Sequence, residues 1–206
     1  MALAHRWTNR NLSRLELAFA VLTIAIFIGA FMDRGLRIFA MAEERAMQAS
    51  VLNINTALQI MLFQTTSAGR NAELMQWDHA NPMKLLDSSR MIVNVETLPA
   101  HPELARLAPL SIGLGFRYLG EFEFPDPQTI DGGYWYYDLG EKVLVYRIKN
   151  SEFFQSPLSG LARIRFAVEL RFDDLNGDGQ YNPDAEAVYG AALLPQDEYH
   201  WMEAGS

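Results

Sequence analysis

The chain has 206 residues, half of them hydrophobic, and its 25 acidic and 17 basic residues give a net charge of -8. This length suits one membrane anchor and one globular domain of ordinary size. The basic residues form no cluster, which argues against a nucleic-acid-binding surface. The absence of cysteine excludes disulfides, thiol catalysis and cysteine-ligated zinc. Because the basic residues form no cluster, any partner is expected to be a protein.

One long apolar run lies near the N-terminus, within the sequence RNLSRLELAFAVLTIAIFIGAFMDRG. From Leu17 to Met32 it holds 16 residues without a charge. A helix needs about 20 apolar residues to cross roughly 30 Å of hydrocarbon. The sequence therefore predicts a transmembrane helix over residues 12–34.

The flanks of this run indicate its orientation. Three basic residues precede it: Arg6, Arg10 and Arg14. This bias favours a cytoplasmic N-terminus, with the globular remainder on the outer side of the membrane. A cleaved secretory signal is the alternative, because Gly29 and Ala30 supply small residues for a cleavage site. Against it, the run is long for a signal and the helical pattern continues beyond it.

The helical pattern extends through residues 35–64 as an amphipathic continuation. Apolar residues recur there at three- and four-residue steps: Leu36, Phe39 or Ala40, Met47, Val51, Ile54, Leu58 and Met61. No proline interrupts the chain before Gln64. One helix from about Leu12 to Gln64 would be roughly 80 Å long at about 1.5 Å per residue. Its second part has a single apolar stripe that requires a cover.

This layout resembles the type IV pilin and pseudopilin family. Its members have a short basic leader, here residues 1–11, and an apolar helix with one Glu near its start. An amphipathic continuation then packs on a C-terminal antiparallel sheet. The resemblance implies cleavage between Asn11 and Leu12. It also implies that Glu16 pairs with the N-terminal amine of a neighbouring subunit and so sets the assembly register.

Glu16 is a candidate on physical grounds as well, because an ionisable group within a membrane is costly unless it is paired. The family usually has Gly before the cleavage point and Phe or Met after it, where this chain has Asn11 and Leu12. Arg14 occupies a position that is normally uncharged. The alternative is an interfacial Glu16 that reaches water or pairs with Arg10 or Arg14 of its own helix.

Residues 65–206 are expected to form the globular domain. Residues 65–109 are loop-rich, with brief helical turns expected at 83–86 and 103–107. Beyond them, alternating polarity predicts five strands, at residues 117–122, 134–138, 143–148, 162–172 and near 187–194. In the strand at 162–172, the even-numbered apolar residues share one face, so one sheet face is buried and the other is wet. The predicted fold is α+β, with the helix packed on an antiparallel sheet.

Aromatic residues concentrate in the sequence GGYWYYDLGEKVLVYRIKN, residues 132–150. This stretch is similar to minor components of pilus biogenesis systems, such as that of the mannose-sensitive haemagglutinin pilus. The aromatic group consists of Tyr134, Trp135, Tyr136, Tyr137 and Tyr146. Cross-strand packing is its favoured role, because aromatic residues alternate on paired strands. A platform for a carbohydrate or a partner is the alternative.

An acidic loop, residues 173–186, follows the strongest strand. Its oxygen-bearing residues fall at alternate positions, as in a calcium loop, and Gly179 occupies the sixth position, where a sharp turn is needed. The candidate Ca²⁺ ligands are Asp174, Asn176, Asp178, the carbonyl of Gln180, Asn182 and Asp184. The twelfth position is Ala185, so either Asp184 or Glu186 would supply the last ligand. The alternative is a polar turn without metal.

No catalytic pattern accompanies these features. The four histidines, His5, His79, His101 and His200, lie far apart in the sequence and match no zinc motif. No nucleophile elbow, phosphate loop or dinucleotide fingerprint occurs, so we expect no enzyme. The expected function is a pilin-like subunit or accessory of a type IV pilus or type II secretion assembly. Its expected partners are other pilins or pseudopilins and assembly-platform proteins in the bacterial inner membrane.

The alternative function is a single-pass anchor that does not polymerise. It would carry a periplasmic scaffold or ligand-binding domain. Both functions place the C-terminal domain in the periplasm, but only the polymerising subunit requires Glu16.

Overall fold

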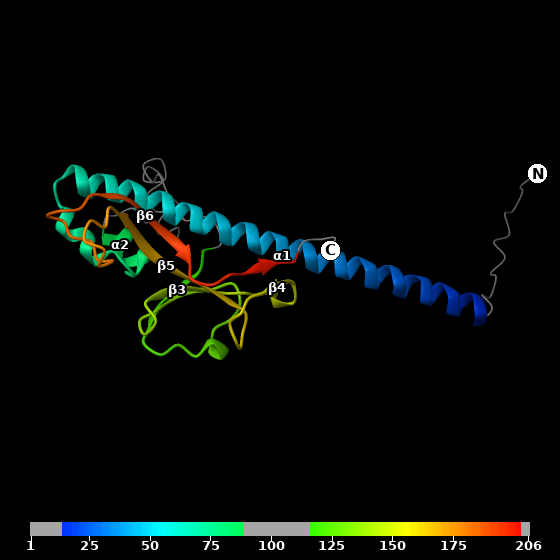
Figure 1. Ribbon diagram of the computed structural model, residues 1–206. Coiled ribbons are helices and arrows are strands. Elements are labelled where there is room, and N and C mark those ends of the chain that lie inside the picture. The colour runs from blue at the N-terminus through cyan, green and yellow to red at the C-terminus, as the bar shows by residue number, and fades with distance from the viewer. Residues whose placement is uncertain (1–13, 89–115, 203–206) are drawn as a thin grey trace, which may run out of the picture. The chain divides into compact units, whose positions relative to one another are not determined.

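The computed structural model describes residues 14–88 and 116–202 of the chain (Figure 1). The chain divides into two compact units, Met1–Phe39 and Ala40–Ser206. The first unit contains the beginning of helix α1, Arg14–Ser67, and the second contains the rest of α1 and the sheet. The long helix predicted over 12–64 is thus confirmed within the described part of the chain.

Two short helical segments follow α1. The 3-10 helix η1 spans Asn71–Gln76, and α2 spans Pro82–Ser88. The turn expected at 83–86 is confirmed as part of α2, whereas the turn expected at 103–107 lies outside the described residues. Within the described residues, two further short helices, η4 at Pro127–Thr129 and η5 at Ser151–Phe153, lie in connections of the sheet domain.

The main sheet has five strands in the order β1-β2-β3-β5-β6. Their bounds are β1 Tyr118–Phe122, β2 Trp135–Asp138, β3 Val143–Arg147, β5 Arg163–Phe172 and β6 Val188–Pro195. A smaller sheet pairs β4, Phe154–Gln155, with β7, His200–Trp201. All five predicted strands are present, while the small sheet was not predicted because its strands are too short to show a period.

The prediction of a wholly antiparallel sheet is wrong at its first strand. β1 pairs with β2 in parallel, and the remaining neighbours in the main sheet are antiparallel. A parallel pair requires a crossover of about a dozen residues or more. Residues 123–134 supply this connection, so the sheet is mixed.

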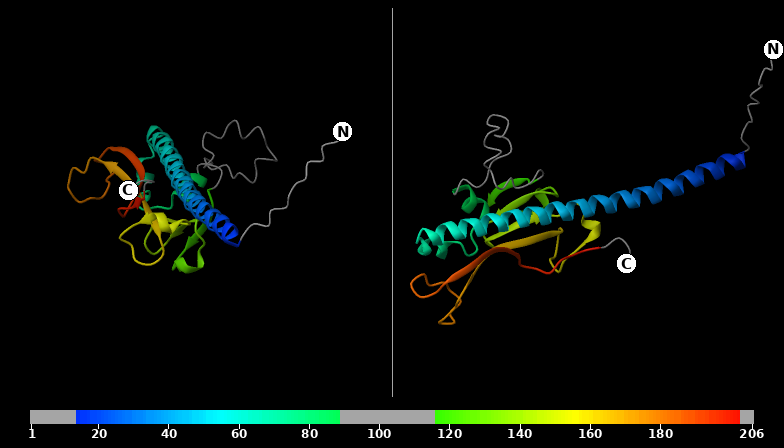
Figure 2. Two further views of the ribbon diagram at one scale, coloured as in Figure 1. Left: turned by 90° about the vertical axis from the view of Figure 1, so that its right-hand side faces the viewer. Right: turned by 90° about the horizontal axis from the view of Figure 1, so that it is seen from above.

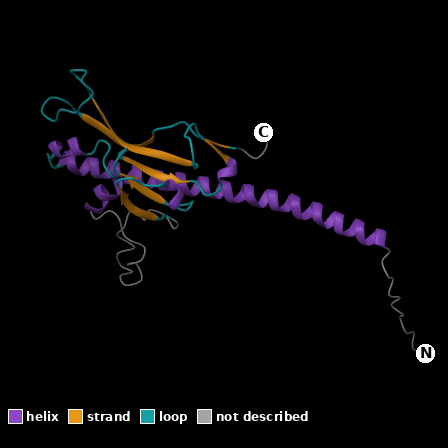
Figure 3. Ribbon diagram, turned by 90° about the horizontal axis from the view of Figure 1, so that it is seen from below, coloured by secondary structure: helices purple, strands orange, loops and turns teal. Residues whose placement is uncertain are grey.

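In the second unit, α1 covers one face of the sheet, as the purple helix and orange strands of Figure 3 show. The resulting core joins the helix stripe of Met47, Ile54 and Leu58 to residues of all the central strands. Trp135 is one of its two tryptophans, and the centroid of its ring lies 4.8 Å from that of Tyr146 on β3. Cross-strand packing of the aromatic residues is therefore confirmed for this pair.

The opposite face of the sheet is less exposed than the sequence predicted. A second apolar cluster lies there, formed by Ile130, Tyr136, Val143, Val145 and Ala167. Ile130 belongs to the β1–β2 crossover, so the same connection that makes the sheet mixed also covers part of its second face. Alternation along β5 alone does not reveal this cover.

Polar side chains of α1 also bind the sheet domain. Asn55 accepts a hydrogen bond from Leu193 N at 2.6 Å, and Gln59 donates to the carbonyl oxygen of Ala191 at 2.6 Å. Both partners belong to β6, an edge strand of the main sheet. The two amides therefore satisfy backbone groups that an edge strand would otherwise expose.

Glu43 makes a third polar connection. Its carboxylate accepts hydrogen bonds from Lys149 N, Asn150 N and the Asn150 side chain, and from the Tyr146 hydroxyl. Burial and the negative charge of Glu43 raise the pKa of Tyr146. One carboxylate thus fixes the end of β3 to α1.

Arg165 links three parts of the sheet domain. Its guanidinium binds Asp197 in a bidentate manner, at 2.8 and 2.7 Å, and reaches Glu141 in the β2–β3 turn at 2.8 Å. The hydrogen bonds from Arg165 lower the pKa of Asp197. The pair therefore stabilises the fold above the unfolded Asp pKa of about 3.9, and this stabilisation is lost as the pH falls through the lower folded value.

We predict that Asp197→Asn lowers the free energy of unfolding by about 1–3 kcal/mol at pH 7, because it removes a bidentate, charge-assisted pair. Thermal unfolding of the purified chain in neutral detergent measures this change. The difference from the unsubstituted chain should shrink as the pH falls below about 3.9. Glu73→Gln, in the exposed Arg70–Glu73 pair, is the control and should change stability by less than about 1 kcal/mol. A pH-independent loss in Asp197→Asn would contradict the assignment.

Candidate functional site

In the first unit, the described part of α1 presents many exposed apolar side chains. Phe31 is 83% exposed, and large side chains at many other positions of Leu17–Met32 are exposed as well. One helix near the N-terminus is long and apolar enough to cross a membrane. A helix that is apolar all round is stable in lipid and unfavourable in water.

Glu16 lies in the first turn of α1 and its side chain is exposed. A carboxylate in this position interacts favourably with the positive end of the helix dipole. The two residues at the expected cleavage point, Asn11 and Leu12, lie outside the described residues. The structure therefore locates the candidate assembly carboxylate at the start of the apolar helix.

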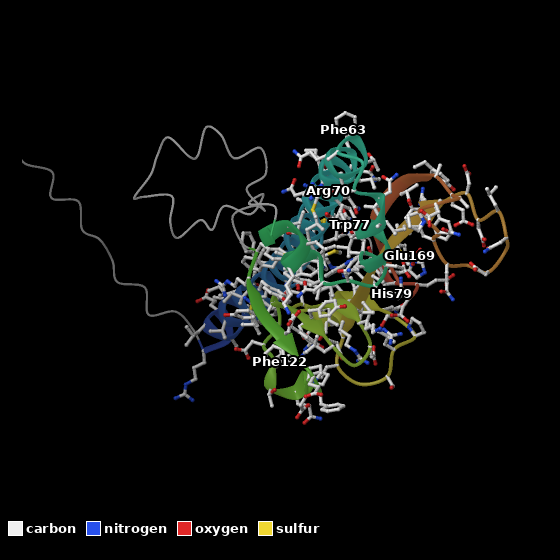
Figure 4. All side chains as sticks on the ribbon, turned by 90° about the vertical axis from the view of Figure 1, so that its left-hand side faces the viewer. Phe63, Arg70, Trp77, His79, Phe122 and Glu169 are labelled. Atoms are coloured by element: carbon white, nitrogen blue, oxygen red, sulfur yellow. The ribbon has the colours of Figure 1, made fainter. Side chains whose placement is uncertain are left out.

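In the second unit, α1 has a face that points away from the sheet. We call it the outward face; its exposed members are Ala42, Ala46, Ala49, Leu52, Thr56 and Phe63. Most of these side chains are small or apolar, although Arg45 and Gln48 lie among them. Phe63 is 72% exposed and projects from the end of α1 (Figure 4). Small side chains let two helices approach closely, so this face suits contact with another helix.

The acidic loop connects β5 to β6 and extends away from the sheet (Figure 2). Asp174 accepts hydrogen bonds from Gly177 N and Gly179 N, at 2.7 and 3.0 Å. Both glycines have φ of +72°, a conformation that favours glycine. Asp178 accepts from Gln180 N at 2.7 Å. Backbone N–H groups of the loop therefore surround its own carboxylates.

Glu186 is the carboxylate that closes this loop. It is only 7% exposed and accepts hydrogen bonds from Leu175 N at 3.0 Å and Asn182 N at 2.8 Å. Asp184, which the sequence placed in the ligand set, is exposed. Sequence spacing left the last ligand open between these two residues. Only the folded loop reveals that Glu186 turns inward.

The residues of the loop suit a hard cation, because Ca²⁺ binds carboxylate, amide and carbonyl oxygens. Within residues 14–88 and 116–202, no three His, Cys, Asp or Glu side chains converge as a metal-ligand cluster. Three of the six predicted ligands are the side chains of Asn176 and Asn182 and the carbonyl of Gln180. A cluster made only of His, Cys, Asp and Glu side chains does not include them. Calcium binding therefore stays a prediction.

The two described histidines lie apart from this loop. His79 has a positive φ of 52°; its N–H donates to the Val168 carbonyl oxygen at 2.8 Å, and its carbonyl oxygen accepts from the Tyr137 hydroxyl at 2.6 Å. These bonds hold His79 and the connection before α2 against β5 (Figure 4). His200 pairs with Gln155 in the small sheet. The visible roles of His79 and His200 are therefore backbone contacts.

Comparison of the chain with protein family profiles, curated protein sequences and solved structures gives no match.

We predict that millimolar Ca²⁺ raises the melting temperature of the purified chain, because the cation would offset repulsion among loop carboxylates. An added stability of about 1 kcal/mol corresponds to about 2–4 °C in a domain of this size. Asp178→Ala should abolish the rise. Asp173→Asn, which changes an exposed carboxylate just before the predicted ligands, should preserve it.

Differential scanning fluorimetry, with each variant compared in Ca²⁺ and in EDTA, separates loss of binding from loss of folding. An unchanged melting temperature in Ca²⁺, or an equal rise in Asp178→Ala, would exclude this loop as a calcium site.

Proposed function

We propose that the chain is a pilin-like subunit or accessory of a type IV pilus or a type II secretion assembly. It is a single-pass protein of the bacterial inner membrane, with its N-terminus in the cytoplasm and its sheet domain in the periplasm. Its partners are other pilins or pseudopilins and the proteins of the assembly platform. It acts by helix-to-helix packing and subunit contacts, without catalysis.

The observation that carries this proposal is the surface of α1. Over Leu17–Met32 the helix exposes apolar side chains, and in the second unit it covers the sheet with one face and leaves the outward face uncovered. An anchor that only tethers a domain requires the apolar part. The outward face, with Ala42, Ala46 and Ala49, is an additional feature that packing against a second helix explains.

Glu16 would set the register of this packing. Its carboxylate lies at the start of the apolar helix. A positive group on a neighbouring subunit would attract this carboxylate most strongly at one axial offset between helices. The resemblance to pilins supplies the N-terminal amine as that partner.

The acidic loop would have a structural role in this scheme. A cation bound by Asp174 and Asp178 would stiffen the connection between β5 and β6, which forms part of the surface available to other subunits. The loop is not expected to take part in chemistry.

Single-cysteine cross-linking tests the proposed helix packing, because the chain contains no cysteine of its own. We predict that Ala49→Cys, on the outward face, cross-links to a neighbouring subunit with a short bis-maleimide in cells that make the assembly. Gel electrophoresis of the membrane fraction measures the products. Gln128→Cys in η4, on the opposite side of the sheet, is the exposed control and should cross-link less.

Glu16→Gln in the Ala49→Cys background should reduce the cross-linked species if Glu16 sets the register. Mass spectrometry of the same protein should find a mature N-terminus at Leu12 if the leader is cleaved. Monomer alone at Ala49, with an intact Met1, would instead favour the anchor that does not polymerise.

A further inference from the structure

Two arginines face each other across the sheet without a carboxylate partner. Arg147 on β3 and Arg163 on β5 are register partners in an antiparallel pair. Like charges that lie directly opposite each other destabilise strand pairing. Neither guanidinium forms an ion pair with any residue of the described ranges 14–88 and 116–202. This arginine pair, Arg147 with Arg163, is unusual in a chain of net charge -8.

Arg147 is the buried member of the pair, at 8% exposure. Its Nε donates to the Pro127 carbonyl oxygen at 3.2 Å, and its Nη1 donates to the Ala162 carbonyl oxygen at 2.7 Å. Burial lowers the pKa of Arg147, and the charge of Arg163 acts in the same direction. Buried charges are normally paired with an opposite charge. The hydrogen bonds of Arg147 go instead to neutral carbonyl groups.

Arg165, two residues after Arg163 on β5, shows how a partly buried arginine is usually neutralised. It is less buried than Arg147, yet its guanidinium binds the carboxylates of both Asp197 and Glu141. The negative charge of Asp131 acts on Arg147, but Asp131 is exposed and forms no ion pair with it within the described residues. Arg165 is thus paired directly with two carboxylates, whereas Asp131 and Asp197 act on Arg147 and Arg163 without forming an ion pair with them in the described residues.

The connection before β5 holds both guanidinium groups in place. Arg163 Nη1 donates to the carbonyl oxygens of Ser159 and Leu161, at 2.9 and 3.2 Å, next to the Ala162 carbonyl that Arg147 binds. These bonds leave Nη2 of Arg147, and Nε and Nη2 of Arg163, without a hydrogen bond to any residue that the structure describes. Several charged donors are thus fixed in position and still available.

Tyr136 provides a second, independent observation. Its side chain is only 1% exposed, and its hydroxyl makes no hydrogen bond to another residue in the described part of the chain. Burial raises the pKa of Tyr136, and the charges of Arg163 and Arg147 oppose this rise, so the ring lies within their field. The charges of Asp138 and Glu141 also act on Tyr136. Tyr136 pairs with Val145, two residues before Arg147 on β3, so its side chain lies on the same face of the sheet as the arginine pair.

We propose that Arg147, Arg163 and Tyr136 bind a phosphate group. A bound oxyanion would neutralise the buried guanidinium and accept hydrogen bonds from the remaining donors, which are strong when the groups are charged. A carboxylate offers two oxygens, whereas a phosphate monoester offers three terminal oxygens for three side chains. The group is either free phosphate or the headgroup of a phospholipid, and the test distinguishes these sources. The proposal does not depend on polymerisation.

The test uses the full-length chain purified in a neutral detergent that contains no phosphate. Inorganic phosphate is titrated at constant ionic strength against chloride, and the melting temperature and the amide exchange of residues 159–163 are measured. Phosphate should raise the melting temperature saturably and slow the exchange. Arg163→Gln should weaken the apparent affinity by about tenfold or more, because it removes charge-assisted bonds. Tyr136→Phe should weaken it by about threefold, because it removes one neutral donor.

Arg171→Gln is the matched control, since Arg171 is an exposed arginine on the same strand, and its response should equal that of the unsubstituted chain. Arg147→Gln removes buried contacts and can unfold the domain, so the conclusion rests on Arg163→Gln and Tyr136→Phe. Both variants leave the bonds of Arg147 to Pro127 and Ala162 in place.

A parallel measurement places the chain in nanodiscs of phosphatidylcholine with or without phosphatidic acid. A response to inorganic phosphate supports the site with free phosphate as its ligand. A response only to phosphatidic acid, lost in Arg163→Gln, supports a lipid headgroup. No response in either arm, or an equal response in Arg163→Gln, overturns the proposal.

Discussion

The contact between α1 and the five-stranded sheet is the interaction on which the second unit depends. Ile54 and Leu58 are fully buried in it, and each such side chain contributes about 1.5–3 kcal/mol through removal from water. Apolar contact alone does not fix the position of α1 along the sheet, whereas polar side chains do. Asn55 and Gln59 bind the backbone of β6, and Glu43 binds the end of β3, so the helix cannot slide along the sheet without losing these bonds. They also cover an edge strand that would otherwise be open to other chains.

The same helix meets two different requirements in its two parts. Over Leu17–Met32 its side chains are apolar on every side, which suits lipid, and after Ala40 apolar side chains face the sheet while the outward face keeps small residues. This change of pattern within one uninterrupted helix is the physical basis of the proposed function. A helix of a water-soluble domain would carry polar residues along its whole outer surface.

Local periodicity predicted most of this architecture. The three- and four-residue steps gave α1 and its buried stripe, and alternation gave the five strands of the main sheet, because both patterns are written in neighbouring residues. Local periodicity could not predict features that depend on pairing between segments far apart in the sequence. The parallel pairing of β1 follows from the path of residues 123–134, and the two-residue strands β4 and β7 show no period. The second apolar cluster around Tyr136 was hidden for the same reason.

The candidate sites divide in the same way. Spacing predicted the acidic loop, but only the fold shows Glu186 turned into it. The arginine pair could not be seen in the sequence, because Arg147 and Arg163 become neighbours only when β3 pairs with β5. A buried arginine is recognised as unpaired only after the positions of all nearby carboxylates are known.

We propose that α1 is surrounded by lipid up to about Met32 and by water and the sheet domain after Ala40. Single cysteines introduced along this cysteine-free helix test it directly, since a water-soluble maleimide reacts only with a hydrated thiolate. With the full chain in nanodiscs, Phe19→Cys and Phe27→Cys should resist labelling, while Gln48→Cys should react readily. Labelling of Phe27→Cys at the rate of Gln48→Cys would contradict the account.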